Sequence, residues 1–274
     1  MKSNIRTRIA ACLCLVALIT VFTGGLTLWF GVPQVAVKDA VYADKVKYIA
    51  HRGLSSAYYQ NTALAFEEAA KSEFFYGIET DVWLTKDGKW VCCHDKNPFT
   101  DSSIIITETD YADALNLPLS PEKAGENICT VSDVYLCDFA TYLSICKTYN
   151  KVSVIEIKYK ASKADLQSLL SATAQQTDVE TVQYISFHKE VIDALISING
   201  KLTVQLLMNR KAYALFGMAR GYHLGLRKDL ISPVIVKTLH SKKRYLNVWT
   251  VNDKKEAERL AELGVDFITT DYIF

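Results

Sequence analysis

Two kinds of hydrophobic pattern alternate along most of the chain. Short runs of apolar and β-branched residues are typical of buried strands, and longer stretches with apolar residues every three to four positions are typical of amphipathic helices. The expected strands are residues 47–50, 77–84, 152–158, 182–187, 202–208, 222–226, 246–251 and 265–269. The clearest helical stretches are residues 63–71, 132–149, 163–174 and 254–263. Such alternation predicts βαβ units and a parallel sheet.

The number of strands indicates the fold. Eight strands between residues 46 and 274 predict a (β/α)₈ TIM barrel, whose typical size is ~250 residues. An open doubly wound sheet is the structural alternative, but no Gly-x-Gly-x-x-Gly motif follows the first strand to support it.

One segment departs from the alternation. Residues 83–91 contain a strand, an Asp87-Gly88 turn and a returning strand, which predicts a β-hairpin after the second barrel strand. Residues 97–129 then form a long insertion with little periodicity. Insertions at the carboxyl-end face of a barrel commonly cover or shape the substrate site.

The N-terminal segment has a different composition. Residues 9–32 include no charged side chain, basic residues precede them, and a bilayer-spanning helix needs ~20 apolar residues. We expect a retained transmembrane anchor over residues 1–34 and a tether over residues 35–45. With such an anchor, we expect a single-pass protein of the cell membrane, with its N-terminus in the cytoplasm and its catalytic domain outside. A cleaved signal peptide is the rival, although its apolar region usually has only about 7–15 residues, and a buried soluble helix is the third reading.

Charge and cysteine content exclude some classes of protein. With 31 basic and 30 acidic residues, the chain lacks the positive charge expected of a nucleic-acid-binding protein. Five of the seven cysteines fall outside the apolar run, without Cys-x-x-Cys spacing, which argues against a zinc site or a disulfide framework. We expect small buried hydrophobes, with one disulfide among Cys129, Cys137 and Cys146 left open.

Three acidic residues stand within predicted strands. Glu79 and Asp81 are two positions apart in the second strand, so both point to one face. Glu156 interrupts the apolar run of the following strand. Because unpaired buried carboxylates are costly, a divalent cation between them is the simplest resolution. An all-oxygen ligand set suits one Ca²⁺ or Mg²⁺ better than zinc.

Basic and imidazole side chains lie near the same strand ends. His51 and Arg52 directly follow the first strand, and the hairpin delivers His94. Lys158 shares a face with Glu156, and the alternative role for this lysine is a structural ion pair with that carboxylate. Arg52 and Lys158 can bind a phosphate, and two histidines can accept and donate a proton. Phosphodiester cleavage is the implied reaction class.

The ordered set of motifs resembles that of the glycerophosphodiester phosphodiesterases over residues 47–271. The matching motifs are His51-Arg52-Gly53, Gln60-Asn61-Thr62, Glu79-Thr80-Asp81-Val82, Thr85-Lys86-Asp87-Gly88, His94-Asp95, Glu156-Ile157-Lys158, Ser186-Phe187, Trp249-Thr250-Val251-Asn252 and Thr270-Asp271. The resemblance implies a distorted TIM barrel that hydrolyses glycerophosphodiesters to glycerol 3-phosphate and an alcohol.

The same resemblance implies roles for individual residues. His51 and His94 are the general acid and base in either order, Arg52 and Lys158 contact the phosphate, and the three carboxylates hold the metal. Two departures from the family pattern concern the surroundings of the site: Gln60 replaces a Glu, and residues 96–100 replace an Arg-Thr pair.

Several readings remain open beside this one. The substrate of the same chemistry could be a lysophospholipid or a glycerophosphate polymer, and the rival from another class is a non-catalytic membrane-anchored binding protein. Phe187 and Trp249 are weaker candidates for substrate contact, since each fits the core equally well. Asn252 is expected to cap the helix that follows. The remaining residues are expected to be structural or solvated: His188, His223, His240, Lys237, Lys242, Lys243 and Arg244.

Overall fold

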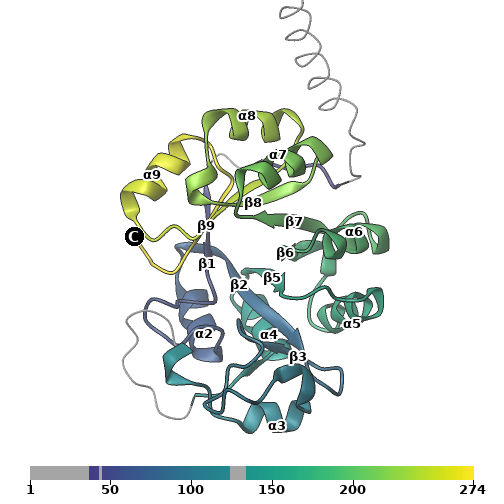
Figure 1. The fold of residues 1–274 in the computed structure, drawn as a ribbon. Coiled ribbons are helices and arrows are strands. Elements are labelled where there is room, and N and C mark those ends of the chain that lie inside the picture. The colour runs from purple at the N-terminus through teal and green to yellow at the C-terminus, as the bar shows by residue number, and fades with distance from the viewer. Residues whose placement is uncertain (1–36, 43–44, 124–133) are drawn as a thin grey trace, which may run out of the picture. The chain divides into compact units, whose positions relative to one another are not determined.

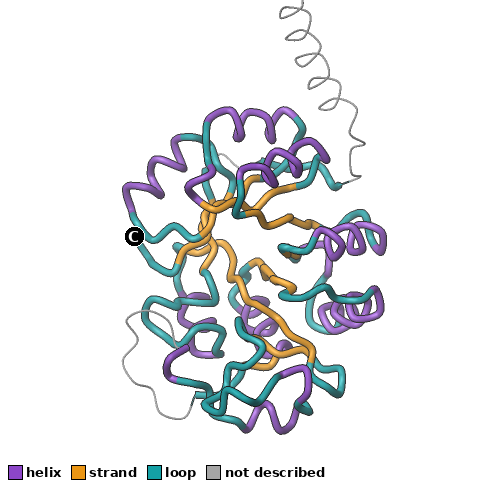
Figure 2. Tube along the Cα trace, in the orientation of Figure 1, coloured by secondary structure: helices purple, strands orange, loops and turns teal. Residues whose placement is uncertain are grey.

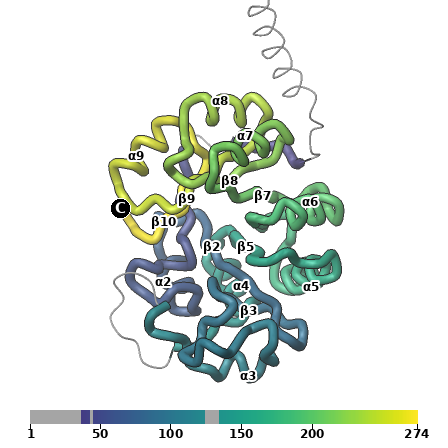
Figure 3. The backbone as a smooth tube through the Cα atoms, in the orientation of Figure 1, coloured from purple at the N-terminus to yellow at the C-terminus, as the bar shows by residue number. Residues whose placement is uncertain are grey.

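Eight parallel strands close into a barrel in the computed structural model, which describes residues 37–42, 45–123 and 134–274 (Figure 1). The barrel strands are β1 (Lys47–Ala50), β2 (Phe75–Leu84), β5 (Val152–Ile157), β6 (Gln183–Ser186), β7 (Thr203–Met208), β8 (His223–Arg227), β9 (Leu246–Trp249) and β10 (Phe267–Thr270). Each pairs in parallel with the next, and β1 pairs with both β2 and β10, which ends beside the C-terminus in Figure 3. The predicted TIM barrel is confirmed.

Helices surround this ring of strands (Figure 2). They are α2 (Ala63–Lys71), α4 (Phe139–Thr148), α5 (Lys163–Ala174), α6 (Lys189–Ile198), α7 (Lys211–Arg220), α8 (Pro233–Ser241) and α9 (Lys254–Glu262). Their starts follow local side-chain chemistry: Thr62 accepts a hydrogen bond from the Ala65 backbone N–H, and Ser162 forms a capping box with Asp165. Short 3₁₀ helices occupy Ile106–Glu108, Pro121–Lys123, Val179–Thr181 and Lys228–Leu230.

The predicted hairpin extends β2 beyond the barrel. Strand β3 (Trp90–Cys92) runs antiparallel to the end of β2, and the turn places Gly88 at a φ of 77°, which glycine adopts readily. A further strand, β4 (Cys137–Asp138), pairs antiparallel with β3. This strand overturns part of the predicted helix 132–149, because Asp138 caps α4 and the helix begins only at Phe139.

The insertion packs around apolar side chains of its own. It contains α3 (Tyr111–Asn116), and Phe99, Ile106 and Leu119 bury their side chains together with Val91 of β3. Its residues 124–129, and the four residues that follow, lie outside the described part of the chain. The insertion is therefore held against the hairpin, at the edge of the barrel that β2 extends.

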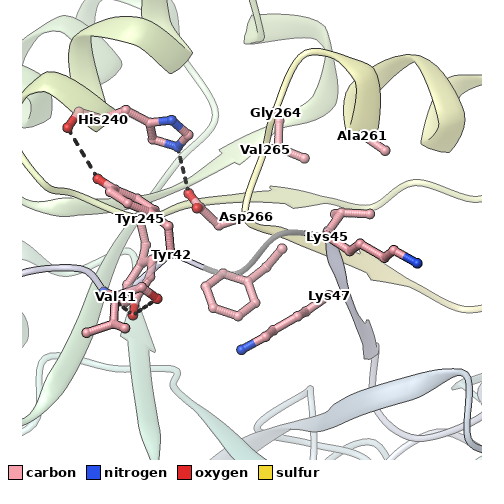
Figure 4. Close-up of a pocket in the computed structure, with 12 residues that line it drawn as sticks. Val41, Tyr42, Lys45, Lys47, His240, Tyr245, Ala261, Gly264, Val265 and Asp266 are labelled. Atoms are coloured by element: carbon pink, nitrogen blue, oxygen red, sulfur yellow. Dashed lines mark hydrogen bonds and ion pairs between the residues drawn. The ribbon is translucent and has the colours of Figure 1, made fainter.

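Residues 37–42 run along the amino-end face of the barrel. Asp39 forms ion pairs with Arg244 at 2.8 Å and with Lys243 at 3.5 Å. The expectation of a solvated basic cluster is wrong for Arg244, whose side chain is only 12% exposed, whereas Lys237 and Lys243 are exposed as expected. Beside this segment lies a cavity of about 340 Å³, in which Tyr42 packs on His240 (Figure 4).

The expected membrane anchor and the expected state of the cysteines can be checked only in the residues that the structure describes. Among residues 37–42, 45–123 and 134–274, no helix is long and apolar enough to cross a bilayer; the expected anchor, residues 1–34, lies outside them. Cys92, Cys93, Cys137 and Cys146 are buried free thiols, as expected of small hydrophobes, so no disulfide joins Cys137 to Cys146. Cys129 lies outside the described residues.

Candidate active site

The predicted site residues meet at the carboxyl ends of the barrel strands. They surround a cavity of about 270 Å³, and Asp81 is the one predicted residue that does not line it. Asp81 is fully buried and ion-paired with two lining residues, Arg52 and Lys158. The lining residues are His51, Arg52, Glu79, His94, Glu156, Lys158, Ile185, Phe187, Leu207, Asn209, Asn247, Trp249, Thr250 and Thr269.

Glu79, Asp81 and Glu156 form a buried acidic triad. Asp81 of β2 is in direct register with Glu156 of β5, and one oxygen atom from each of the three residues lies within 4.8 Å of the other two. Glu79 Oε1 is buried with no hydrogen-bond partner among the described residues. Burial, with the neighbouring carboxylates, raises the pKa of Glu156 to about 7 and that of Glu79 well above its usual range. A cluster of carboxylate oxygens, one of which has no hydrogen-bond partner, fits a hard divalent cation such as Mg²⁺ or Ca²⁺.

Two cations lie beside the triad. Arg52 Nε is 3.0 Å from Asp81 Oδ2, and Lys158 Nζ is 3.2 Å from Asp81 Oδ1. Lys158 also donates a hydrogen bond of 2.9 Å to Glu156 Oε1, so the ion pair anticipated as an alternative exists. Burial opposes ionisation of Asp81, but Arg52 and Lys158 outweigh it and lower the pKa of that carboxyl. Asp81 therefore stays ionised while its two acidic neighbours favour the protonated form.

The backbone after β1 turns sharply to place Arg52. Arg52 has a φ of 60°, and its N–H donates to Glu79 Oε2 at 2.9 Å. Gly53 follows with a φ of 81°, and a Cβ at this position would approach the Ala65 carbonyl carbon to 2.6 Å. Only glycine fits between this turn and α2, which explains why a glycine follows Arg52.

His51 is oriented by an aspartate from the last strand end. His51 Nδ1 lies 2.7 Å from Asp271 Oδ1, and Asp271 accepts further hydrogen bonds from Ser55 Oγ at 2.8 Å and Asn252 Nδ2 at 2.5 Å. Burial, followed by the charge of Arg52, lowers the pKa of His51. Burial opposes ionisation of Asp271, but its bond to His51 and its other partners lower its pKa to about 2. A neutral imidazole that donates from Nδ1 leaves Nε2 as the proton acceptor.

The hydrogen bond between Asn252 and Asp271 corrects the predicted role of Asn252 and adds Asp271 to the residues of the site. Asn252 does not cap α9: Asp253 does, by accepting a hydrogen bond of 2.8 Å from the Glu256 backbone N–H. Asn252 instead holds Asp271, whose role was not identified in the sequence. The available signal was the position of Asp271 immediately after the last barrel strand, on the face where His51 stands.

His94 reaches the same cavity from the hairpin. Its Nδ1 lies 2.9 Å from Asp95 Oδ1, and its backbone carbonyl accepts a hydrogen bond of 3.1 Å from Trp83 Nε1. Burial lowers the pKa of His94, and Arg52 and Lys158 lower it further against the opposing effect of Asp81. Both histidines thus favour the neutral form, and each has a carboxylate at Nδ1.

The part of the chain that forms the barrel and this cavity matches a known protein family. The sequence profile of the glycerophosphoryl diester phosphodiesterase family matches residues 51–274. The chain belongs to this family. The predicted family and the predicted enzyme class, a phosphoric diester hydrolase, are confirmed.

Individual relatives of this phosphodiesterase match it over most of their length. A glycerophosphodiester phosphodiesterase from Bacillus altitudinis is 26% identical over 240 residues, which cover 82% of this chain and 94% of the relative. A glycerophosphodiester phosphodiesterase structure from Parabacteroides distasonis is 26% identical with a TM-score of 0.68, covering 83% and 93%. An Oleispira antarctica phosphodiesterase, solved in complex with the product sn-glycerol-3-phosphate, is 17% identical with a TM-score of 0.69, covering 83% and 94%.

Two aromatic side chains line the same cavity. Phe187 and Trp249 pack edge to face with ring centroids 5.4 Å apart, and Phe187 is 41% exposed. The three other histidines lie outside this cavity, as expected. His188 stands before α6, His223 is buried in β8, and His240 pairs with Asp266 at the opposite end of the barrel.

Proposed function

We propose that the chain hydrolyses glycerophosphodiesters to sn-glycerol 3-phosphate and an alcohol, with one divalent cation held by Glu79, Asp81 and Glu156. The observation that carries this proposal is the acidic triad itself, with its orphaned Glu79 oxygen, in one cavity with two histidines. Family membership supports the reaction class, and the relative solved with sn-glycerol-3-phosphate supports the product.

Different side chains of the site bind the phosphate, transfer protons and orient the histidines. Arg52 and Lys158 bind and orient the phosphate oxygens, since both place a cation at the cavity wall. One histidine, in its neutral form, takes the proton of the attacking oxygen at Nε2. The other enters the step as the imidazolium, with its Nδ1–H on its carboxylate, and gives its Nε2 proton to the departing alcohol. Asp271 and Asp95 hold the opposite ring nitrogens of the two histidines. When bound, the divalent cation supplies stabilisation of the negative charge that develops on the phosphoryl group.

The ligand chemistry narrows the choice of metal. All three proposed ligands are carboxylates, which suit Mg²⁺ or Ca²⁺. No cysteine or histidine belongs to this cluster among the described residues, so we propose one of these two ions rather than zinc.

Product analysis tests the reaction. The full-length chain in detergent is incubated with glycerophosphodiesters of several alcohols, with a lysophospholipid, and with an aromatic phosphodiester that lacks glycerol as the specificity control. Release of sn-glycerol 3-phosphate and the free alcohol from at least one glycerol diester is expected. A folded, metal-supplemented protein that releases no glycerol 3-phosphate from any of them contradicts the proposal and favours a binding role.

We also propose that the N-terminal segment anchors the enzyme in the cell membrane with the catalytic domain outside the cytoplasm. The support is the uncharged stretch of residues 9–32 and the basic residues before it. The expected result is that the full chain sediments with membranes, resists extraction by high salt and is cleaved by protease added outside intact cells. A chain of lower mass, free of the membrane fraction, would support a cleaved signal peptide instead.

A further inference from the structure

Basic residues are concentrated in one part of the chain. Residues 210–244 include nine of the 31 basic side chains and only one of the 30 acidic side chains, Asp229. That aspartate pairs with a neighbour in sequence, since Asp229 Oδ1 lies 2.6 Å from Arg227 Nε. The chain as a whole is nearly neutral, so this stretch carries a local positive charge that an acidic excess elsewhere balances.

The fold places this stretch on one outer wall of the barrel. It includes α7, β8 and α8, and the two helices are neighbours (Figure 1). Lys242, directly after α8, donates a hydrogen bond of 3.1 Å to the Met218 carbonyl of α7. Arg244 Nε donates one of 2.7 Å to the Gly221 carbonyl, at the end of α7. The exposed basic residues lie on or beside these two helices: Arg210, Lys211, Arg227, Lys228, Lys237 and Lys243.

The same wall exposes large apolar side chains. On α7, Tyr213 is 55% exposed, Leu215 41% and Phe216 43%. Val234, in the first turn of α8, is 71% exposed. Apolar and aromatic side chains beside basic ones are typical of surfaces that lie at a lipid bilayer, where the rings sit among the headgroups.

Charge and apolar content together narrow the kind of partner. A nucleic acid would contact the basic residues through its phosphates but would leave Leu215, Phe216 and Val234 without a role. A bilayer with anionic headgroups matches both features, because the headgroups attract lysine and arginine and the apolar side chains enter the interfacial region.

The course of the chain also favours a bilayer. Residues 37–42 begin three positions after the proposed anchor, residues 1–34. Within them, Asp39 pairs with Lys243 and Arg244, directly after α8. The chain that follows the proposed anchor therefore contacts the domain at one end of this same wall.

We propose that the outer wall formed by α7 and α8, through its exposed residues between 210 and 244, docks on the surface of a bilayer that contains anionic lipids. This inference goes beyond the proposed reaction and does not depend on it. Asn209, directly before the wall, lines the catalytic cavity, so a docked wall borders the active site.

Hydrogen exchange of the full-length chain in lipid nanodiscs tests the docking. One set of discs contains phosphatidylcholine alone, and the other contains equal parts of phosphatidylcholine and phosphatidylglycerol. Backbone amides of α7 and of the first turn of α8 are expected to exchange more slowly in the anionic discs, whereas those of α5 should exchange alike in both. Added salt should remove the difference, because it screens the attraction between the wall and the headgroups.

Charge reversal at the start of α7 should abolish this protection. Each basic side chain near an anionic surface contributes about fivefold to binding, so Arg210→Glu with Lys211→Glu is expected to lower the docking constant roughly 25-fold or more. The matched control is Lys254→Glu with Lys255→Glu, an exposed basic pair at the start of α9, which should leave the protection unchanged.

A second pair of variants tests the apolar contribution. Leu215→Ser with Phe216→Ser is expected to weaken the protection in anionic discs, because these side chains no longer enter the interfacial region. Leu64→Ser replaces a leucine that is 54% exposed on α2 and should have no effect on α7. Circular dichroism checks that each variant is folded.

The outcomes separate docking from the other proposals. Equal exchange of α7 in the two kinds of disc, or protection that survives Arg210→Glu with Lys211→Glu, would overturn docking. Protection that appears in neutral discs and grows with protein concentration would overturn it in favour of a second copy of the chain on this wall. None of these measurements requires turnover, so failure of the proposed reaction is a distinct result.

The test also remains decisive for a chain that does not retain the proposed anchor. Such a chain is mixed with vesicles of the same two lipid compositions and centrifuged. Sedimentation with the anionic vesicles, lost in Arg210→Glu with Lys211→Glu, is the expected result. Sedimentation with neither kind of vesicle would contradict the docking.

Discussion

The two ends of the barrel each hold a histidine paired with an aspartate. At the carboxyl end, His51 Nδ1 lies 2.7 Å from Asp271, and at the amino end His240 Nε2 lies 3.1 Å from Asp266. The two pairs differ in their surroundings. Asp266 also accepts a hydrogen bond of 2.7 Å from the Leu246 backbone N–H, and Tyr42 packs on His240, so this pair completes the contact between residues 37–42 and the barrel.

The carboxyl-end pair stands in a different electrostatic setting. Arg52, Lys158 and the acidic triad share its cavity wall or lie directly beneath it, and a second histidine faces the same space. A histidine–aspartate pair is thus not diagnostic of catalysis by itself. Opposite charges concentrated beside a cavity, with a buried Glu79 oxygen that has no hydrogen-bond partner among the described residues, distinguish the proposed active site from the structural pair.

The largest expected difference between the ends is in turnover. His51→Ala or His94→Ala should lower kcat by roughly 10²–10⁴-fold, the usual effect of losing a general acid or base, whereas His240→Ala should leave kcat close to that of the unsubstituted enzyme. Steady-state assays with circular dichroism as a folding check measure this. Near-normal kcat in a folded His51→Ala enzyme would remove His51 from the mechanism.

Asp271→Asn should have the next largest effect. The variant keeps the shape of the partner but removes the charge that stabilises protonated His51, so kcat should fall by about 10²-fold. Because the hydrogen bond and charge of Asp271 both raise the pKa of His51, their loss should move the pH limb that reports His51 to lower pH. The other limb of the kcat/KM profile should stay in place; a profile that does not move contradicts the assigned contact.

A smaller effect than these losses of kcat is expected when the pH changes the affinity of the acidic triad for metal. The folded-state pKa of Glu156 is raised to about 7, and that of Glu79 lies above its usual range, so both carboxyls hold protons at low pH. Since a metal ligand must lose its proton, affinity should be weak below pH 7 and rise as pH increases through that value, by roughly tenfold per pH unit for each proton displaced. Calorimetric titration with Mg²⁺ or Ca²⁺ at pH 6 and pH 8 checks this sign.

The smallest effect on catalysis is expected from the amino-end pair. Asp266→Ala leaves the Leu246 N–H without its acceptor and should reduce the free energy of unfolding by about 1–3 kcal/mol. The kcat of the folded variant should be unchanged. Chemical denaturation with a parallel activity assay separates the two quantities, and a large loss of kcat would show that the two ends are functionally linked.

Local patterns in the sequence were sufficient to predict the barrel and most of the residues that meet at its strand ends. The alternation of strands and helices indicated the fold, and charged residues inside apolar strands, such as Glu156, identified the acidic triad before its geometry was known. The Asp-Gly turn was equally informative about the hairpin. Each of these signals lies within a few residues of the feature that it predicts.

Some contacts between distant segments were not predicted. Asp271 lies 220 residues from His51, and Gln60 lies 63 residues from Lys123, and no local pattern records either pairing. Asn252 was misassigned because Asp253, its neighbour, satisfies the same capping rule. Strand β4 has only two residues, too few for a periodic signal. These features depend on how the closed barrel brings its strand ends and loops together.

The most direct test of the account measures bound metal and turnover on the same samples. The full-length enzyme is freed of metal with chelator and reloaded with increasing amounts of Mg²⁺ or Ca²⁺, and the bound ion and the rate of glycerol 3-phosphate release are determined at each step. The account predicts that the rate rises in proportion to bound ion, saturates at one ion per chain, and is lost together with the ion in Glu79→Gln. Full turnover in the metal-free enzyme, or unchanged ion binding in Glu79→Gln, would contradict it.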